Sequence, residues 1–574
     1  MLFLGVYDPS SSQFEPSEIE ELKHAISRQS DDKRHLVLAE NFALITIDFG
    51  PTGGALVIEN DLGHVGMVVG RPYLNMDNAG TDANILIKAL KNRDVEALTL
   101  VRGSFCGICF DKRSKSLMLC TDKVGVFPIY IAKVGNRIYF SNALRMLRSI
   151  TKIPKKIVPE HMFSQLAFGY CLARDTIFAG IDRMYGGELI EIAASTMHIN
   201  SYWRWDDIKP SHYSENELQE RIYQAFIDAV KIRVEPTPAE LSFLSGGLDS
   251  RCIVAALRNI DRPVWTLNFA PDGSQDHLFG RLAATALGSH HYELGLGRDS
   301  FSKRQRKILD SWASAHPELV KRGVKAHRVW SGDGGSVGMG HVYLDHAFIQ
   351  LLREKKIQAA SEYLMKHRKL GIPLGMLRSD VKHEAESRPL EKMTREMQSF
   401  TPEDDGKSGL LFFLMNDQRH HLSNYFEDLD LYQFEVVLPF FDSVLLELIV
   451  AAPIDDFLLH TFYNKWLAKF GPAISTVPWQ AYPNHVPCPI YSEEYGKLRY
   501  QWNEDWFDKA ENDRKLQEKL GEWRRMLARN GFPKQILAKN KLWLAYWLTR
   551  LKIRDYTYIL DAAKEIIFFN DDTH

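Results

Sequence analysis

Residues 241–258 read LSFLSGGLDSRCIVAALR, an apolar strand followed by a glycine-rich turn and by a helix without proline. Two adjacent glycines allow the backbone to approach a ligand closely, and the first N–H groups of the following helix point toward negative charge. This order of elements predicts an anion site, and the expected ligand is the phosphate chain of a nucleotide. The residues assigned to this site are Ser245, Gly246, Gly247, Asp249 and Ser250.

The chemistry of the turn narrows the choice of nucleotide reaction. It lacks the GxxxxGK[ST] spacing, and no lysine follows the second glycine, which disfavours ordinary kinase or GTPase chemistry. Asp249 beside Ser250 suits a phosphate-bound Mg²⁺, because this cation typically takes one or two protein carboxylates and completes its shell with phosphate oxygens and water. A capped strand-to-helix turn would explain the same residues without a ligand. The complete string in its strand–helix context favours the nucleotide site.

Length, charge and cysteine content limit the class of protein. A chain of 574 residues is too long for one compact core and predicts two or three domains. A net charge of −2 without a basic run gives no long-range attraction for nucleic acid or an anionic membrane, so we expect a small-molecule or peptide substrate. Six scattered cysteines suit a reducing compartment, and the cytoplasm is the expected location. The single pair Cys106 and Cys109 predicts buried strand cysteines rather than a metal or redox centre.

The pattern of the chain changes near residue 200. Before it, short strands and turns predict an α+β domain built on antiparallel sheet, and the segment Tyr202–Ser214 is the expected crossing into a second domain. From Glu215 onward, strands alternate with helices, which implies a parallel, doubly wound sheet with ligands beyond the carboxyl ends of its strands. A second glycine-rich turn, SGDGG at residues 331–335, is expected at that same edge. Later segments are predicted to be mostly helical.

Several ordered motifs resemble those of the asparagine synthetase family. RGSFCGICFDKRSKSLMLCTDKVGVFPIYI, YFSNALRML and TIFAGIDRMYGGELIEI resemble its amidohydrolase domain. SFLSGGLDSR, SQDHLFGRLAATALGSHHYEL, VWSGDGGS and FEVVLPFFDSVLLELI resemble the successive signatures of its ATP-pyrophosphatase domain. The resemblance implies a degenerate glutamine amidotransferase-like domain with an Ntn-hydrolase-like sandwich fold at residues 1–205. It implies an α/β PP-loop ATP-pyrophosphatase domain with a mostly helical C-terminal part at residues 215–574.

Position two departs from the glutamine-using members of that family. There a cysteine becomes the N-terminal nucleophile, whereas this chain has Leu2, which has no nucleophilic atom. The departure implies that the domain is kept as structure without glutaminase activity. It is similar in this to β-lactam synthetase and the cyclases of lasso-peptide pathways, in which the attacking amine belongs to a substrate.

The resemblance implies a two-step reaction with ATP and Mg²⁺. A substrate carboxylate attacks the α-phosphate of ATP and releases pyrophosphate, and an amine then opens the acyl adenylate to give an amide. Asp249 is the implied magnesium ligand. Gly332 and Asp333 match a loop whose acidic residue helps to deprotonate the amine.

Two departures affect this site. The family's second magnesium aspartate is replaced by Ser336, which supplies no charge. The family's lysine that stabilises the transition state has no counterpart in TVPWQAYPNHVPCPI, so His485 and Lys465 are candidate substitutes. The alternative is that His485 is an ordinary loop histidine and Lys465 an ordinary surface lysine.

Three further side chains are candidates for the substrate pocket. Glu435 aligns with a family glutamate and is a candidate base or amine binder, with the structural alternative that it holds the helix before Pro439. His420 and His421 are also candidates, although adjacent helical residues point in divergent directions and a shared metal is not expected.

Three functions remain open from the sequence. The leading hypothesis is a biosynthetic carbon–nitrogen ligase that is ATP-dependent and AMP-forming. Its expected substrate is a small molecule or peptide with a carboxylate and an amine. Whether it also binds a partner protein of its pathway is left open. The first alternative is a macrolactam or isopeptide cyclase acting on a precursor peptide. The second is a non-catalytic nucleotide-binding paralogue.

Overall fold

Two compact units make up the chain. In the computed structural model, the described residues are 1–10, 13–29, 32–50, 56–60, 63–74, 83–194, 196–295, 301–500, 509–529 and 532–569. The first unit, which we call the main unit, combines Met1–Ile153, Asp182–His346 and Thr401–Gln501. The second, which we call the helical unit, combines Pro154–Ile181, Ala347–Phe400 and Trp502–His574. The boundary expected near residues 205–215 stays a prediction.

Two six-stranded sheets form the first part of the main unit. Their strand orders are β10-β8-β9-β1-β3-β2 and β12-β11-β7-β6-β5-β4. Sequence neighbours such as β6 and β7 pair antiparallel, which matches their short apolar runs separated by tight turns. The strands are β1 Leu2–Tyr7, β2 Arg34–Ala39, β3 Phe42–Ile47, β4 Leu56–Asn60, β5 His64–Gly70, β6 Phe105–Asp111, β7 Ser116–Thr121, β8 Tyr130–Val134, β9 Arg137–Ser141, β10 Ile181–Arg183, β11 Glu188–Ala193 and β12 Thr196–Ser201.

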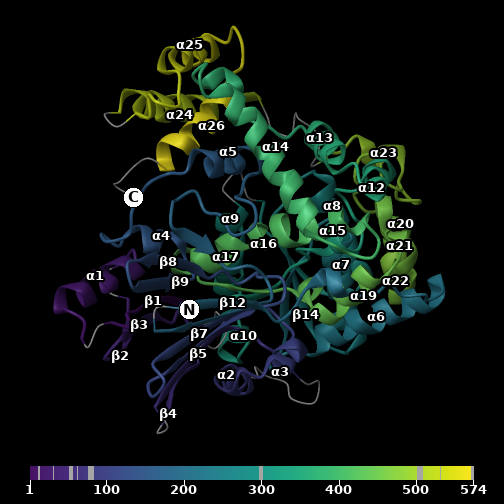
Figure 1. Cartoon of the computed structure of the whole chain (residues 1–574). Coiled ribbons are helices and arrows are strands. Elements are labelled where there is room, and N and C mark those ends of the chain that lie inside the picture. Colours follow the sequence, from purple (N-terminus) through teal and green to yellow (C-terminus); the bar gives the residue numbers. More distant parts are fainter. Residues whose placement is uncertain are drawn as a thin grey trace. The chain divides into compact units, whose positions relative to one another are not determined.

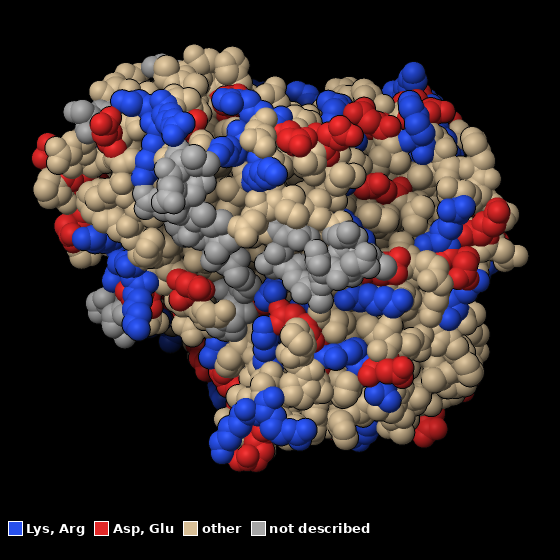
Figure 2. All heavy atoms as spheres, turned by 90° about the horizontal axis from the view of Figure 1, so that it is seen from below, with Lys and Arg blue, Asp and Glu red and all other residues tan. Residues whose placement is uncertain are grey.

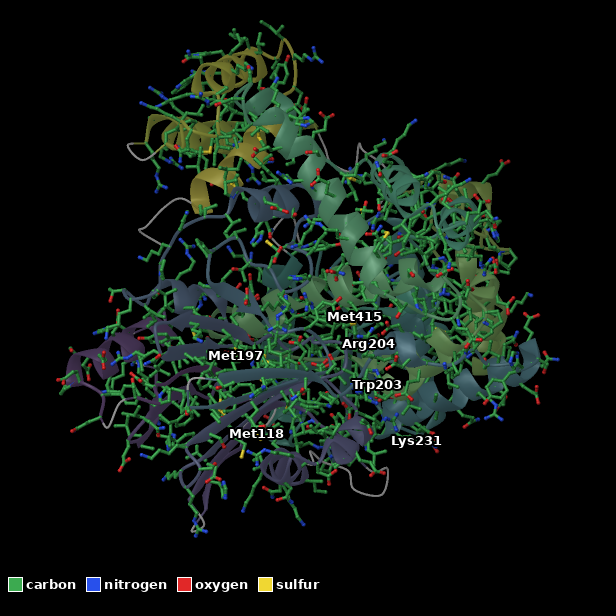
Figure 3. All side chains as sticks on the ribbon, in the orientation of Figure 1. Met118, Met197, Trp203, Arg204, Lys231 and Met415 are labelled. Atoms are coloured by element: carbon green, nitrogen blue, oxygen red, sulfur yellow. The ribbon has the colours of Figure 1, made fainter. Side chains whose placement is uncertain are left out.

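The sheets form a sandwich because successive side chains of each strand point to opposite faces. Phe3 and Ile108, from different sheets, belong to one buried core. On the outer faces, α1 (Pro16–Ile26) packs against β1 and β3, and α2 (Ala83–Asn92) packs against β5 and β6. Figure 3 labels two side chains of the second sheet, Met118 in the core beneath α2 and Met197 beside the sandwich core.

The two cysteines of the CxxC pair lie on opposite faces of β6. Cys106 belongs to the sandwich core, whereas Cys109 belongs to the core beneath α2. Because they are three residues apart on a strand, they cannot face one ligand. The prediction of buried strand cysteines is confirmed.

The second part of the main unit is a five-stranded parallel sheet of order β15-β14-β13-β16-β17. The first strand in sequence is central, later strands lie on both sides of it, and the order therefore reverses between β13 and β16. In open α/β sheets, ligands bind beyond the carboxyl ends of the strands at such a switch point. The strands are β13 Glu240–Phe243, β14 Val264–Asn268, β15 His290–Glu293, β16 Arg328–Trp330 and β17 Glu435–Val437.

Helices connect and cover these parallel strands (Figure 1). The first, α6, begins with a capping box in which Ser214 and Glu217 satisfy each other's backbone N–H groups. Helix α7 packs against β13 and β14, and α8 packs against β14 and β15. The α-helices of this part are α6 Glu215–Lys231, α7 Asp249–Asn259, α8 Gln275–Ala286, α9 Phe301–Ala315, α10 Pro317–Lys321, α11 Gly335–Gly338, α15 Lys407–Phe412, α16 Arg419–His421, α17 Ser423–Glu427, α18 Leu429–Tyr432, α19 Ser443–Ala451, α20 Ile454–Phe457, α21 Thr461–Trp466, α22 Pro472–Ser475 and α23 Glu493–Gly496.

The helical unit has its own core, which is centred on Trp523 and includes Met162. Its helices α24, α25 and α26 lie together as the yellow group in Figure 1. Its main helices are α5 Pro159–Phe168, α12 His346–Arg353, α13 Ile357–His367, α14 Lys382–Ser399, α24 Lys509–Ala528, α25 Lys539–Arg550 and α26 Thr557–Phe569, with His346 itself counted in the main unit.

The predicted secondary structure classes are confirmed. The antiparallel α+β part, the parallel α/β part and the mostly helical later segments are all observed. Within the described residues, every helix is too short or too polar to serve as a candidate membrane span. The face drawn in Figure 2 carries acidic and basic side chains interspersed.

Candidate functional site

The two glycine-rich turns meet at the switch point of the parallel sheet. The first follows β13, the second follows β16, and these strands pair directly. Gly332 allows the close approach, because a Cβ atom there would lie 2.8 Å from the Cβ of Asp249 and from the backbone nitrogen of Ser250. A Cβ atom at Gly335 would lie 2.5 Å from the Cγ of Asp249. Glycine is therefore required at both positions, and the structure brings the predicted residues of the two turns together.

Side chains hold the first turn in shape. The Ser245 N–H donates to the Ser250 Oγ at 3.0 Å, and the Gly247 N–H donates to the Ser245 Oγ at 3.2 Å. The Gly246 N–H donates to the Asp276 Oδ1 at 2.6 Å. Burial raises the pKa of Asp276, whose role in the turn was missed from the sequence. Its only sequence signal is its place at the start of the motif SQDHLFG.

Asp249, the first residue of α7, is partly buried, and its carboxyl group is held by hydrogen bonds from its own chain. Its Oδ1 accepts from the Tyr463 hydroxyl at 2.7 Å, and its Oδ2 accepts from the Ser336 N–H at 3.0 Å and the Ser336 hydroxyl at 2.9 Å. Burial raises its pKa to about 6, against the effect of these hydrogen bonds. Ser336, which replaces the family's second acidic ligand, is therefore a donor to the first. Tyr463 was missed because it lies far away in the sequence.

Arg251 links the first turn to the stretch that contains no lysine. Its buried guanidinium donates to the Gly247 carbonyl at 2.9 Å and to the Val477 and Pro478 carbonyls, each at 2.9 Å. Burial lowers its pKa to about 10, so it stays charged at neutral pH. The Gln480 N–H also donates to the Gly246 carbonyl at 3.1 Å. Arg251 thus positions the turn, and this role was not predicted from the sequence.

Asp333 forms a second polar centre in the turn after β16. Its Oδ1 lies 3.2 Å from the His421 Nε2, and its Oδ2 accepts from the Ser331 hydroxyl at 2.6 Å. Burial opposes ionisation of Asp333, but the hydrogen bonds from His421 and Ser331 outweigh it and lower its pKa. The hydrogen bond to Asp333 raises the pKa of His421. Asp333 is therefore an ionised carboxylate paired with an imidazole.

The neighbouring histidines differ as expected for adjacent helical positions. The His420 Nδ1 lies 2.8 Å from the Arg183 guanidinium, and burial together with that charge lowers the His420 pKa well below its usual value. His421 instead reaches Asp333.

His485, a candidate substitute for the missing lysine, is uncharged at neutral pH. Its Nδ1 lies 2.8 Å from the Nδ1 of His460, and burial lowers the pKa of His485. It therefore supplies no positive charge in place of a lysine.

The expectation for Lys465 is corrected by the structure. Its ammonium pairs with the Glu215 carboxylate at 2.7 Å, and both side chains are about half exposed. Tyr463, two residues earlier on α21, reaches Asp249, and two helical residues are about 200° apart around the axis. Lys465 therefore faces away from the first turn and lies on the surface.

The expectation for Glu435 is also corrected. Both of its carboxylate oxygens accept from the Arg71 guanidinium, one of them at 2.8 Å. Glu435 is the first residue of β17 and is level with Arg328, the first residue of β16. Because the glycine turns leave the opposite ends of these strands, Glu435 belongs to an ion-pair network at the amino end of the sheet.

A first prediction tests the placement of Lys465. We expect Lys465→Ala to change the affinity for magnesium–ATP less than twofold, because an exposed ion pair contributes roughly 1 kcal/mol or less and this one faces away from the turn. Isothermal titration calorimetry of both proteins with magnesium–ATP checks it. A loss of affinity for magnesium–ATP of tenfold or more would show that Lys465 contributes to the nucleotide site after all.

The residues at the first turn fit a phosphate-bound magnesium ion in type. Among the described residues, no group of three or more His, Cys, Asp and Glu side chains is arranged to hold a metal. Magnesium carried by phosphate needs only one or two protein carboxylates, and Asp249 is one such carboxylate beside Ser245 and Ser250. The nucleotide-binding and metal-binding roles of these residues, and of Gly246, Gly247 and Gly332, remain predictions.

Comparison with known proteins identifies the two kinds of domain. Residues 75–203 match the family described as glutamine amidotransferase domain, and residues 221–317 match asparagine synthase. A putative glutamine-hydrolyzing asparagine synthetase 2 of Methanocaldococcus jannaschii is 25% identical over 46% of this chain and 55% of the relative. The carboxyethyl-arginine beta-lactam-synthase of Streptomyces clavuligerus is 24% identical over 42% of this chain and 44% of the relative. These matches support an assignment to the asparagine synthetase family.

The extent of these matches is partial. The chain spans about half the length, or less, of the curated relatives that it matches, including 37% of asparagine synthetase 1 of Bacillus subtilis at 22% identity. A solved glutamine phosphoribosylpyrophosphate amidotransferase from B. subtilis is 12% identical and covers 59% of this chain and 77% of its own, with a TM-score of 0.24.

Proposed function

We propose that the protein is an ATP-dependent amide ligase that activates a substrate carboxylate as an acyl adenylate and joins it to an amine, with release of pyrophosphate and AMP. The observation that carries this proposal is the meeting of two glycine turns at the switch point, one with Asp249 and the other with Asp333. Such a position is where open α/β sheets bind ligands, and the start of α7 favours negative charge. The names of the relatives support the same reaction class.

The residues of the first turn have separate roles in this proposal. The N–H groups at the start of α7 bind the phosphate chain, and the Ser245 and Ser250 hydroxyls keep the turn in shape. Asp249 would hold the magnesium ion, which when bound supplies positive charge for the leaving pyrophosphate. Arg251 fixes the turn against residues 477–478. Its guanidinium has five N–H donors and makes five hydrogen bonds within the protein, so its role is to position the turn.

We further propose that the amine comes from the substrate or from free ammonia rather than from glutamine. Leu2 is fully buried in β1 and has no nucleophilic atom. The cysteines are all buried, and burial raises the pKa of Cys109 to about 11. Because the thiolate is the nucleophilic form of cysteine, a buried thiol with a raised pKa is a poor catalyst.

A second prediction follows for glutamine. We expect no release of glutamate above the rate without enzyme when the protein is incubated with glutamine, with or without magnesium–ATP. An enzyme-coupled glutamate assay measures this, and a known glutaminase serves as the positive control. Glutamate formation that depends on the protein would contradict the proposed source of the amine.

The experiment that tests the reaction uses magnesium–ATP with a panel of carboxylates. The panel contains aspartate with ammonium, carboxyethyl-arginine, and peptides with a free amine and a side-chain carboxylate, chosen because the names of the relatives cover amide formation and ring closure. We expect pyrophosphate and AMP in equal amounts with one class. Product from a peptide alone would select the cyclase. Failure of magnesium–ATP to bind would remove the function, and binding without turnover on any member would favour a non-catalytic nucleotide-binding protein.

A further inference from the structure

The carboxylate of Asp333 and the ring of His421 form a pair that opens to solvent on one side. His421 ends α16, which follows a π-helical segment, Phe413–Gln418, that contains the labelled Met415 of Figure 3. Asp333 stands in the turn after β16, directly after the glycine that packs on Asp249. The His421 side chain is 57% exposed, whereas that of Asp333 is 12% exposed. The imidazole is thus the accessible member of the pair.

The hydrogen bonds of Asp333 determine which nitrogen of His421 carries a proton. The Asp333 Oδ1 pairs with the His421 Nε2, and the ionised carboxylate only accepts, so Nε2 carries the hydrogen. In the neutral ring this leaves the lone pair on Nδ1. Asp333 also accepts from the Ser331 hydroxyl and is hydrogen-bonded to Tyr425, whose hydroxyl accepts from the Gln305 amide at 3.0 Å. A partly buried carboxylate that accepts from these donors is a weak base, so Asp333 orients the ring instead.

We propose that His421 is the general base that takes the proton from the attacking amine, and that Asp333 is the positioning residue that sets its tautomer. This inference rests on the proposed amide ligase function. In the step, the amine nitrogen bonds to the carbonyl carbon of the acyl adenylate, the bond from that carbon to the phosphate oxygen breaks, and AMP leaves. The proton of the amine moves to the His421 Nδ1 and is then lost to solvent, so the products are an amide, AMP and one proton.

The charges around the ring suit this role near neutral pH. Asp333 faces Nε2 from the turn, and Asp417 adds negative charge from the π-helical segment, and both favour the protonated ring. Tyr425 on α17 is hydrogen-bonded to Asp333, and the charge of Asp333 acts on Asp249 on α7. A base is most effective when its pKa lies near the working pH, and a histidine raised above its ordinary value meets that condition.

The functional test separates adenylation from amine attack. His421→Gln keeps a side-chain N–H for Asp333 but cannot accept a proton. With the carboxylate selected by the panel, we expect amide formation to fall about 100-fold, the usual scale of general base catalysis. Hydroxylamine is uncharged near neutral pH and needs no base, so trapping of the adenylate as a hydroxamate is expected to stay within about threefold of wild type under the same scale. His346→Gln, another exposed histidine near a carboxylate, is the matched control and is expected to alter neither rate.

A substrate-free measurement tests the pair itself. NMR titration of the His421 ring, assigned through His421→Gln, is expected to show a pKa above the ordinary value for histidine, and Asp333→Asn is expected to lower it. An unchanged His421 titration in folded Asp333→Asn overturns the pairing, and equal losses of amide and hydroxamate in His421→Gln overturn the role as base. Absence of hydroxamate in the wild type with every carboxylate would instead remove the proposed function, and this inference with it.

Discussion

Asp249→Ala is expected to lower the rate of ATP-dependent pyrophosphate release by about 1,000-fold, the upper scale for losing one preorganised electrostatic group. The carboxylate is the single acidic group at the start of α7 in the described site, and the family's second acid is replaced by Ser336. A chain with two carboxylates could retain some magnesium affinity after losing one. Here the remaining partners of Asp249, the Tyr463 and Ser336 hydroxyls, carry no charge.

The measurement compares pyrophosphate release and magnesium–ATP affinity for Asp249→Ala, wild type and a control. Asp272→Ala is the matched control, because Asp272 lies just before α8 with 85% of its side chain exposed. We expect the control to retain wild-type rates, and circular dichroism to show that both variants fold. A rate of pyrophosphate release by Asp249→Ala within tenfold of wild type would contradict the assignment of Asp249 as the magnesium ligand.

Asp442→Ala is expected to lower the free energy of unfolding by about 3–5 kcal/mol, the usual cost of removing one partner from a buried ion pair. Asp442 is fully buried and accepts from Arg102 at 2.8 Å and from Arg233 at 2.7 Å. It also caps α19, since its carboxylate accepts from the Val444 N–H at 3.1 Å. Arg102 comes from the antiparallel part and Arg233 from the chain after α6. The variant leaves the buried Arg233 guanidinium and the partly buried Arg102 guanidinium without this carboxylate.

Urea denaturation of the wild type, Asp442→Ala and the exposed control Asp455→Ala measures the effect. Burial opposes ionisation of Asp442, but Arg233 and Arg102 outweigh it and lower its pKa. A lowered carboxyl pKa stabilises the fold above the unfolded-state pKa, and this stabilisation is lost as the pH falls through the folded-state pKa. The difference between wild type and Asp442→Ala is therefore expected to be full at neutral pH and to shrink below about pH 4. A difference under roughly 1 kcal/mol at neutral pH, as for a surface pair, would contradict this account.

Local sequence patterns were sufficient to predict these strands, turns and helices. The capping box of Ser214 and Glu217 marks the start of α6, and the short, nearly continuous apolar runs of β3 and β7 mark strands of a sandwich. The string Ser-Gly-Gly-Leu-Asp-Ser marks a strand, a turn and a helix, which the structure confirms as β13 and α7. These features depend on bonds and packing within a few residues, so the order of residues determines them.

The two corrections have different physical causes. Lys465 follows a side chain that reaches Asp249, but the helical phase sends it to the opposite side. Glu435 stands in a matching motif, yet it begins β17, and only the register of the parallel pairing shows which end of the sheet that is. A linear motif carries neither the phase of a helix against its neighbours nor the register of a strand.

The missed site residues are distant in sequence from the turns they serve. Asp276 is 30 residues from Gly246, and Tyr463 is 214 residues from Asp249. The amino acid order thus specified strands, helices, the glycine turns and the family. Only folding selected the partners of Asp249 and Asp333, because pairing of β13 with β16 brings two separate turns to one switch point and buries their carboxylates among remote donors.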